Sequence, residues 1–233
     1  MVFFKPKNKF LIRFGNDYNM FVIDFDDTLF DTQKFKDSLN KTLIDCGVSL
    51  VDADWSYQLA RNLPDGQFAY SHVRRAEFLA TRGYDQNLIV TALEKVMANE
   101  SLLLHLLPGV HEFLQTLKDL GKQLILLSLG DPNFQELKVQ GTGIAYYFDR
   151  LFMVPDKKEA VIAELLAHHS PTEYWLVNDK VNETLNIKKS FPDIRVVLKH
   201  SPQIALAEYE KSGESHFETL AEIQTYILET YGK

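Results

Sequence analysis

Short runs of apolar, β-prone residues recur along the chain, and polar or turn-forming residues flank each run. This pattern predicts β-strands. A turn composition at residues 15–19 separates the first two runs, which predict either a hairpin or two successive strands. The predicted strands cover residues 10–14, 20–25, 123–128, 151–154, 174–178 and 194–198.

Between the later strands, apolar residues recur at intervals of three and four positions, which predicts helices. One predicted helix begins at Val110 and stops at Gly121, and two others cover residues 158–168 and 217–231. Strands that alternate with helices at this spacing predict an α/β fold whose core is a doubly wound, Rossmann-like parallel sheet.

The segment from residue 33 to residue 106 has a different pattern. Phe35, Leu39 and Leu43 recur at helical spacing, residues 53–63, 73–81 and 88–97 also suit helices, and no convincing strand pattern is present. We therefore expect two domains. Residues 1–32 and 107–233 form the α/β core domain, and residues 33–106 form an all-helical domain inserted into it.

Composition narrows the functional classes. The 233 residues are 45% hydrophobic and 24% charged, which is ordinary for a globular protein. The net charge of −7 argues against a broadly basic face for nucleic acid or an anionic membrane, and no run approaches the ~18 apolar residues of a membrane span. A single cysteine, Cys46, excludes an intrachain disulfide and fits a reducing, cytoplasmic setting.

Polar side chains that can carry chemistry follow three of the predicted strands. Asp24 and Asp26 end the strand at 20–25, Ser128 ends the strand at 123–128, and Asp179 follows the strand at 174–178. The pair Lys157-Lys158 precedes a predicted helix. Ligand sites in open parallel sheets lie at the carboxyl ends of the strands, so we expect these groups to converge.

This set of groups suits phosphoryl transfer. A carboxylate can attack phosphorus and form an aspartyl-phosphate, which divides one difficult step into two easier ones. Two anions repel, so the attack needs a cation, and Mg²⁺ prefers carboxylate, phosphate and water oxygens. Because residues two apart on a strand point to the same side, Asp26 can give the leaving oxygen a proton beside Asp24.

The sequence Asp24-Phe25-Asp26-Asp27-Thr28-Leu29, after an apolar strand, resembles the first signature of the haloacid dehalogenase (HAD) superfamily. Ser128, the lysine pair, and Asp179 with Glu183 are similar to the second, third and fourth signatures, in the expected order. Pro108-Gly109-Val110, before the helix preceding Ser128, is also similar to many members. The resemblance spans residues 20–200 and places a helical cap at residues 33–106, as in the C1-cap phosphatase-like subgroup.

The resemblance implies a role for each matching position. Asp24 is implied to be the nucleophile and a magnesium ligand, and Asp26 the general acid/base that binds the metal through its carbonyl. Ser128 is implied to bind the phosphoryl group, and Lys157 or Lys158 to stabilise its charge. Asp179 is implied to complete the metal site.

Three positions depart from the superfamily pattern. Asp27 stands where many members have glycine, Asn178 stands where glycine is common, and Glu183 replaces a frequent aspartate. The choice between the two lysines stays open, although Lys158 is favoured because apolar residues follow it at +3, +4 and +7.

The main hypothesis is a magnesium-dependent phosphatase that acts on a small phosphorylated metabolite. A phosphomutase of the same superfamily and a non-catalytic phosphate-binding regulatory module are the alternatives. A dehalogenase is disfavoured because Asp26 supplies the acid that phosphoryl chemistry needs. The sequence leaves the substrate and the oligomeric state open. The inserted segment offers four cationic side chains to an anionic substrate: Arg61, His72, Arg74 and Arg75.

Overall fold

A six-stranded sheet forms the centre of the molecule. In the computed structural model the described residues are 19–61, 70–168 and 173–230, so the predicted strand at 10–14 and the turn after it lie outside them. Every neighbouring pair of strands is parallel, in the order β3-β2-β1-β4-β5-β6. The strands are β1 (Asn19–Ile23), β2 (Gln123–Leu129), β3 (Arg150–Val154), β4 (Glu173–Asn178), β5 (Arg195–Lys199) and β6 (Ser215–Phe217).

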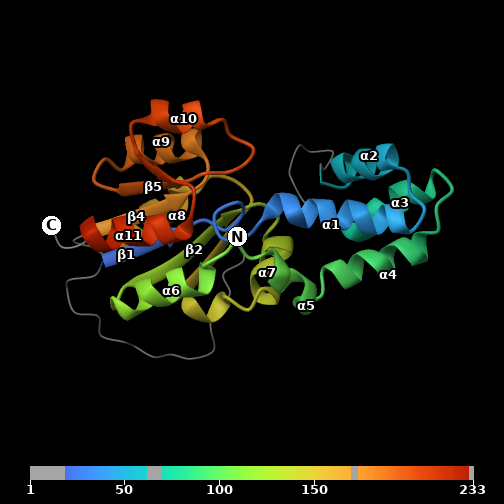
Figure 1. The fold of residues 1–233 in the computed structure, drawn as a ribbon, viewed down its shortest axis with the longest axis horizontal. Helices are drawn as coiled ribbons and strands as arrows, with labels where there is room; N and C mark the ends of the chain where they lie inside the picture. Colours follow the sequence, from blue (N-terminus) through green and yellow to red (C-terminus); the bar gives the residue numbers. More distant parts are fainter. Residues whose placement is uncertain (1–18, 62–69, 169–172, 231–233) are drawn as a thin grey trace.

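Helices cover both faces of this sheet (Figure 1). On one face, Phe21 and Ile23 of β1 join a buried cluster with side chains of α6 (Val110–Asp119) and α11 (Leu220–Thr230). On the other face, Met20 and Val22 pack with side chains of α8 (Glu159–His168) and α9 (Val181–Ser190). Burial on both faces explains why the inner strands are continuous apolar runs instead of alternating ones. The α/β fold with a doubly wound parallel sheet is therefore confirmed.

Some helices cover the sheet, and others extend away from it. The α-helices are α1 (Thr32–Asp45), α2 (Leu50–Arg61), α3 (His72–Ala80), α4 (Gln86–Val96), α5 (Asn99–Leu102), α6 (Val110–Asp119), α7 (Pro132–Gly141), α8 (Glu159–His168), α9 (Val181–Ser190), α10 (Leu206–Ser212) and α11 (Leu220–Thr230). Two 3₁₀-helices are η1 (Leu103–His105) and η2 (Ala145–Tyr147).

Helices α1 to α4 extend away from the sheet (Figure 1). They lie between β1 and β2 in sequence, and their buried residues Leu39, Leu79 and Leu93 continue the apolar cluster on the α6 face. The helices predicted from residue 33 and at 53–63, 73–81 and 88–97 are found as α1 to α4, while residues 62–69 lie outside the described part. A hydrogen bond from Leu107 N–H to the Leu29 carbonyl, at 2.9 Å, links the segment that follows β1 to the segment that precedes α6.

The C-terminal part differs from the sequence prediction. The predicted helix at 217–231 begins only at Leu220, because Phe217 belongs to β6. That strand has three residues, all half-buried, and two of them are polar. A run so short has too little apolar periodicity to predict a strand, and its pairing with β5 decides its conformation.

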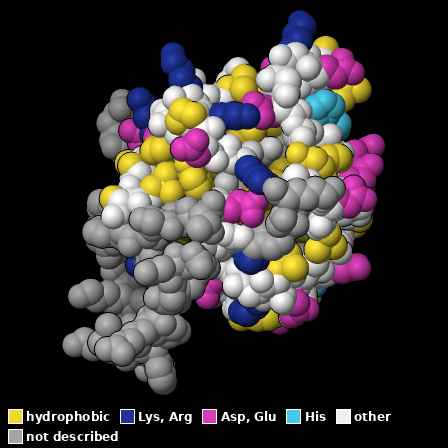
Figure 2. All heavy atoms as spheres, turned by 90° about the vertical axis from the view of Figure 1, so that its left-hand side faces the viewer, with side chains coloured by type: hydrophobic (Ala, Val, Ile, Leu, Met, Phe, Trp, Pro, Cys, Tyr) yellow, Lys and Arg dark blue, Asp and Glu magenta, His cyan; other side chains and the backbone are white. Residues whose placement is uncertain are grey.

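The surface carries charges of both signs. Figure 2 shows basic and acidic side chains interspersed on the described part of the face seen from the left of Figure 1. Within residues 19–230, apart from the gaps noted above, none of the helices combines the length and hydrophobicity needed to cross a bilayer.

Truncation of a β2 core side chain tests the packing. Leu126 is fully buried, so we expect Leu126→Ala to lower the free energy of unfolding by about 2–5 kcal/mol, from lost apolar burial and the cavity left behind. The measurement is urea unfolding. Leu104→Ala, at a side chain that is 65% exposed, is the control and should change stability by less than about 0.5 kcal/mol. Equal effects would contradict the assigned core.

Candidate active site

The candidate site lies at the carboxyl ends of β1 and β4. Strand β1 is central, and the strand order runs outward from it in two directions, which makes it the topological switch point where ligands bind in such sheets. The pairing of Ile23 with Val177 is extended by a hydrogen bond from Asp24 N–H to the Val177 carbonyl at 2.9 Å. This pairing fixes Asp24 beside Asn178 and Asp179.

A fully buried ammonium group holds the centre of the site. Lys158 Nζ lies 2.6 Å from Asp24 Oδ1 and 2.8 Å from Glu183 Oε2, and it also donates to Asn178 Oδ1 at 3.1 Å. Lys158 directly precedes α8, and its carbonyl accepts hydrogen bonds from the first turn of that helix. One cation therefore joins residues from β1, β4, α8 and α9.

Burial and neighbouring charges shift the pKa values of this cluster in opposite directions, and for Asp24 burial has the larger effect. Burial alone would lower the pKa of Lys158, but the carboxylates of Asp24 and Glu183 raise it above its ordinary value. Burial raises the pKa of Asp24, and the ammonium groups of Lys158 and Lys180 oppose that effect. An ionised Asp24 in this buried position therefore depends on Lys158.

The two lysines lie in different environments. Lys158 is buried and contacts Asp24, whereas Lys157 is exposed. Helix α8 begins immediately afterwards and buries Val161, Ile162 and Leu165 against the sheet. The lysine in phase with this apolar stripe is the one that reaches Asp24.

Asn178 has a structural role that the sequence analysis missed. Its Oδ1 accepts from Lys158, while its Nδ2 donates to Glu183 Oε2 at 2.9 Å and to Thr184 Oγ1 at 3.0 Å. The sequence marked this position only as a departure from glycine. The amide instead orients Glu183 toward the lysine.

Asp179 provides a buried oxygen without a partner. Its Oδ1 is inaccessible and makes no hydrogen bond with any described residue. Burial, followed by the nearby charge of Asp24, raises its pKa to about 8. A buried carboxyl beside a second carboxylate is a place where a cation stabilises the charged form.

These donors fit magnesium. Asp24 and Asp179 would hold the ion with their side chains. Among the described residues, no three His, Cys, Asp or Glu side chains form a metal cluster. Two carboxylates are nevertheless sufficient for Mg²⁺, which usually keeps substrate phosphate and waters in its remaining positions.

The carboxylate of Asp26 is held at both oxygens. Lys138 Nζ lies 2.5 Å from Oδ1, Thr32 Oγ1 donates to Oδ1 at 3.0 Å, and Gln135 Nε2 donates to Oδ2 at 2.7 Å. Burial would raise the pKa of Asp26, but Lys138 and these hydrogen bonds outweigh it and hold the pKa below the ordinary value. None of these three partners was predicted from the sequence, although Gln135 and Lys138 are spaced to share one face of a helix.

The backbone turns sharply at Asp27. This residue has a φ of +58°, a left-handed conformation that glycine adopts most easily and aspartate tolerates. Its Oδ1 accepts the Thr32 N–H at 3.2 Å, and its Oδ2 accepts from Ser201 Oγ at 3.4 Å. The departure from glycine is thus compatible with the turn, and the side chain ties α1 to the segment after β5.

Ser128 is near the end of β2 and fully buried, and its Oγ has no hydrogen-bond partner among the described residues. The register places Leu126 level with Ile23, so Ser128 lies two residues beyond that level, toward the site edge. The structure gives no direct bond between Ser128 and Asp24. Thr28 does contact the candidate nucleophile, because its Oγ1 lies 3.3 Å from Asp24 Oδ2.

The cationic side chains of the inserted segment differ in what they do. Arg75 is fully buried and donates hydrogen bonds to Asn40 and Ser56, so it links helices of the segment. His72 lies 3.8 Å from Glu94. Arg61 remains a candidate, and it lies over the ring of Tyr57.

Aromatic contacts connect the inserted helices with α7. The ring of Tyr57 lies 5.6 Å from that of Tyr70, which lies 4.8 Å from that of Phe134. Phe134 in turn lies 5.3 Å from Lys138 Nζ, the partner of Asp26. An apolar wall therefore runs from α2 to the carboxylate of Asp26.

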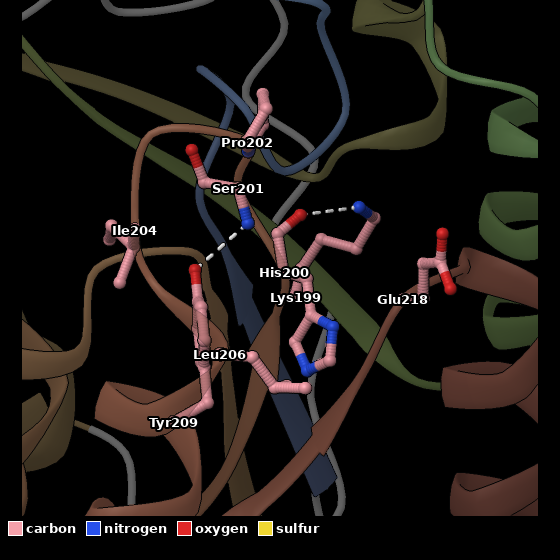
Figure 3. A pocket seen from close by; sticks show the side chains of 8 residues that line it. All are labelled: Lys199, His200, Ser201, Pro202, Ile204, Leu206, Tyr209 and Glu218. Carbon is pink, nitrogen blue, oxygen red and sulfur yellow. Dashed lines mark hydrogen bonds between the residues drawn. The ribbon is translucent and has the colours of Figure 1, made fainter.

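A hollow of about 380 Å³ lies beside the end of β5 (Figure 3). The Tyr209 hydroxyl accepts the Ser201 N–H at 2.8 Å and donates to the Asp179 carbonyl at 3.0 Å, so the hollow shares a wall with the acidic site. The sequence analysis did not anticipate it. Its lining residues are Lys199, His200, Ser201, Pro202, Ile204, Leu206, Tyr209 and Glu218.

Comparison with known proteins gives one family match by sequence. A family model described as haloacid dehalogenase-like hydrolase matches residues 18–185. A search of curated proteins finds no match.

Solved structures share the fold at low sequence identity. A Burkholderia xenovorans protein assigned to the haloacid dehalogenase-like hydrolases aligns with a TM-score of 0.69 at 16% identity, over 91% of this chain and 98% of its own. A protein from Haemophilus somnus described as a phosphoglycolate phosphatase aligns at 0.57 and 17%, over 90% and 97%. The L-2-haloacid dehalogenase of Xanthobacter autotrophicus aligns at 0.57 and 16%, over 92% and 100%. At these identities the likeness shows the fold alone.

Replacement of Asp179 tests the cation site. Because the pKa of Asp179 is raised to about 8 from its ordinary 3.8, the folded state retains a proton that the unfolded state has lost. The metal-free wild type should therefore lose stability relative to Asp179→Asn as the pH rises from about 4 to about 8. Magnesium should raise the melting temperature of the wild type and not of the variant.

Thermal unfolding across this pH range, with a chelator or with millimolar magnesium, makes the measurement. Asp193→Asn, at an exposed turn, is the control and should behave as the wild type. Equal stabilisation of wild type and Asp179→Asn by magnesium would contradict the site.

Proposed function

The chain belongs to the haloacid dehalogenase-like hydrolases, since the family model covers residues 18–185, and within that family we propose that it is a magnesium-dependent phosphatase. Its substrate in this proposal is a small phosphomonoester. The reaction proceeds through an aspartyl-phosphate on Asp24. Asp24, Asp26, Ser128 and Lys158 are the proposed catalytic residues, and Asp24, Asp26 and Asp179 the proposed metal ligands.

The observation that carries this proposal is the buried Asp179 carboxyl oxygen beside Asp24, which has no hydrogen-bond partner among the described residues. A buried site with two neighbouring carboxyl groups repels an anionic substrate unless a cation is bound there. When bound, Mg²⁺ offsets the negative charge of both the phosphate and the attacking carboxylate. The same donor set gives little advantage with a neutral substrate.

In the first half of the reaction, a carboxylate oxygen of Asp24 attacks phosphorus. The bond from phosphorus to the ester oxygen breaks, and that oxygen takes the proton of the Asp26 carboxyl group. Lys158 holds Asp24 through Oδ1 and stabilises negative charge. Ser128 would donate its free hydroxyl hydrogen to a phosphoryl oxygen.

In the second half, Asp26 is a carboxylate and takes a proton from water. The water oxygen forms a bond to phosphorus, and the bond from phosphorus to the Asp24 oxygen breaks. This releases inorganic phosphate and restores both carboxyl groups. In the free protein Lys138 keeps the pKa of Asp26 low. A phosphate dianion nearby favours the protonated form that the first step needs.

Hydrolysis of a carbon–halogen bond would not need Asp26 as a proton donor. Halide leaves as a stable anion and needs no proton donor, so the three partners that hold Asp26 would serve no chemical step. Phosphate esters with alcohol leaving groups do need that proton. The ordered Asp26 therefore supports the phosphatase proposal over dehalogenation.

The proposal also assigns a role to the inserted helices. We assign residues 33–106 to a cap domain and residues 1–32 with 107–233 to the core domain. The aromatic contacts from Tyr57 of α2 to Phe134 of α7 support this assignment, because they join the inserted helices to the helix that carries two partners of Asp26. The proposed setting is cytoplasmic, as the single cysteine favours.

Asp24→Asn tests the nucleophile. The amide cannot attack phosphorus, so we expect phosphate release from a panel of phosphomonoesters to fall by roughly a thousandfold or more. Release from the wild type should require magnesium. Phosphate is measured with and without a chelator, and Asp37→Asn, an exposed position on α1, is the control. A wild type that releases no phosphate from a broad panel would contradict the proposal.

Asp26→Asn tests the acid. We expect the rate with alkyl phosphates, whose leaving groups are poor, to fall by about 10²–10⁴-fold, because general acid catalysis supplies that factor. The rate with p-nitrophenyl phosphate should fall much less, because its leaving group needs no proton. Initial rates with both substrates make the comparison, and equal slowing would exclude the acid role.

A further inference from the structure

Lys138 is a buried cation surrounded by aromatic rings. It lies on α7, its side chain is 3% exposed, and its Nζ lies 5.2–5.3 Å from the ring centroids of Phe25, Phe30 and Phe134. Cation–π attraction stabilises such a position only in part. Burial of an ammonium group is costly unless a carboxylate is paired with it.

Asp26 is that carboxylate. The distance from Lys138 Nζ to Asp26 Oδ1 is 2.5 Å, and no other acidic residue in the described part of the chain forms an ion pair with Lys138. The Asp26 side chain is 25% exposed, so the pair lies at the border between core and site. An apolar side chain of similar length would fill the ring cage without the desolvation cost.

Gln135, one turn earlier on α7, holds the second oxygen. Its Nε2 donates to Asp26 Oδ2 at 2.7 Å and to the Leu129 carbonyl at 2.9 Å. Gly130 leaves room for this amide, since a Cβ there would lie 2.6 Å from Gln135 Nε2. The backbone at Gly130 also has a φ of +145°, which side-chain-bearing residues rarely adopt.

We propose that Lys138 is a positioning residue that fixes the direction of the Asp26 carboxyl group for proton transfer to the leaving oxygen. This inference rests on the proposed phosphatase function and adds a residue to it. Lys138 keeps its own protons throughout, and the proton that moves is that of Asp26. Because Lys138 and Gln135 share one helix face, α7 acts as a rigid support for both carboxyl oxygens.

Orientation matters because proton transfer needs a donor within hydrogen-bond reach and correctly aligned. A carboxyl group that rotates freely about its last bond spends much of its time directed elsewhere. Without Lys138, Asp26 Oδ1 would keep only the neutral hydrogen bond from Thr32, because Gln135 donates to Oδ2. The charge of Lys138 supplies the strongest of the three contacts.

The test compares Lys138→Met with wild type on two substrates. We expect kcat with an alkyl phosphate to fall about 10- to 100-fold with KM nearly unchanged, and kcat with p-nitrophenyl phosphate to fall less than about threefold. Lys188→Met is the matched control, because Lys188 forms a 2.6 Å ion pair with Glu214 and belongs to no part of the proposed site. It should leave both rates unchanged.

A double-mutant cycle separates positioning from structural support. If Lys138 acts through Asp26, Lys138→Met should have no further effect on kcat in the Asp26→Asn background. If the role of Lys138 is purely structural, Lys138→Met should slow the Asp26→Asn variant by the same factor as it slows the wild type. Lys138→Gln, a shorter neutral donor, makes the same comparison if thermal unfolding shows that Lys138→Met does not fold.

The outcomes distinguish the two proposals. A wild type without magnesium-dependent phosphatase activity overturns the proposed function. A wild type that is active, with Lys138 variants that slow both substrates equally or slow the double variant further, overturns the role of Lys138 and leaves the phosphatase proposal intact.

Discussion

The buried contact between Lys158 and two carboxylates is the interaction on which the rest of the site depends. It joins the end of β1, through Asp24, to α9, through Glu183, and Asn178 of β4 completes it. Removal of one partner from a buried ion pair costs about 3–5 kcal/mol, so these elements are held in one arrangement. The same contact makes an ionised Asp24 compatible with burial. Stability of the sheet edge and reactivity of the proposed nucleophile therefore have a common origin.

The fold was largely predictable because the inner strands are buried on both faces. Such strands are continuous apolar runs, and those at residues 20–25, 123–128 and 174–178 were found within one or two residues of β1, β2 and β4. Strand β6 was not found, since it has three half-buried residues and only its pairing with β5 defines it. The local sequence pattern predicts strands that are buried on both faces, but it does not predict a short edge strand that is defined by its pairing.

The candidate site was predictable where topology alone brings residues together. Asp24 and Asp179 follow neighbouring parallel strands, so their proximity needs no knowledge of side chains. Helical periodicity favoured Lys158 over Lys157, and the contact of Lys158 with Asp24 was visible only in the structure. Lys138 and Gln135 were missed because their position over Asp26 depends on how α7 packs, which no local pattern encodes. Asn178 was noticed only as a departure from a common glycine, and its hydrogen bonds with Lys158 and Glu183 explain why an amide suits this position.

The proposed function requires that Asp24 becomes phosphorylated during turnover. The most direct measurement is acid quenching of the enzyme mixed with magnesium and a rapidly reacting substrate such as acetyl phosphate, followed by mass mapping of its peptides. The peptide containing Asp24 should gain the mass of one phosphoryl group, and this species should be absent when magnesium is chelated. Turnover of substrate with a phosphoryl group on another residue, or with none on Asp24 at any quench time, would exclude Asp24 as the nucleophile.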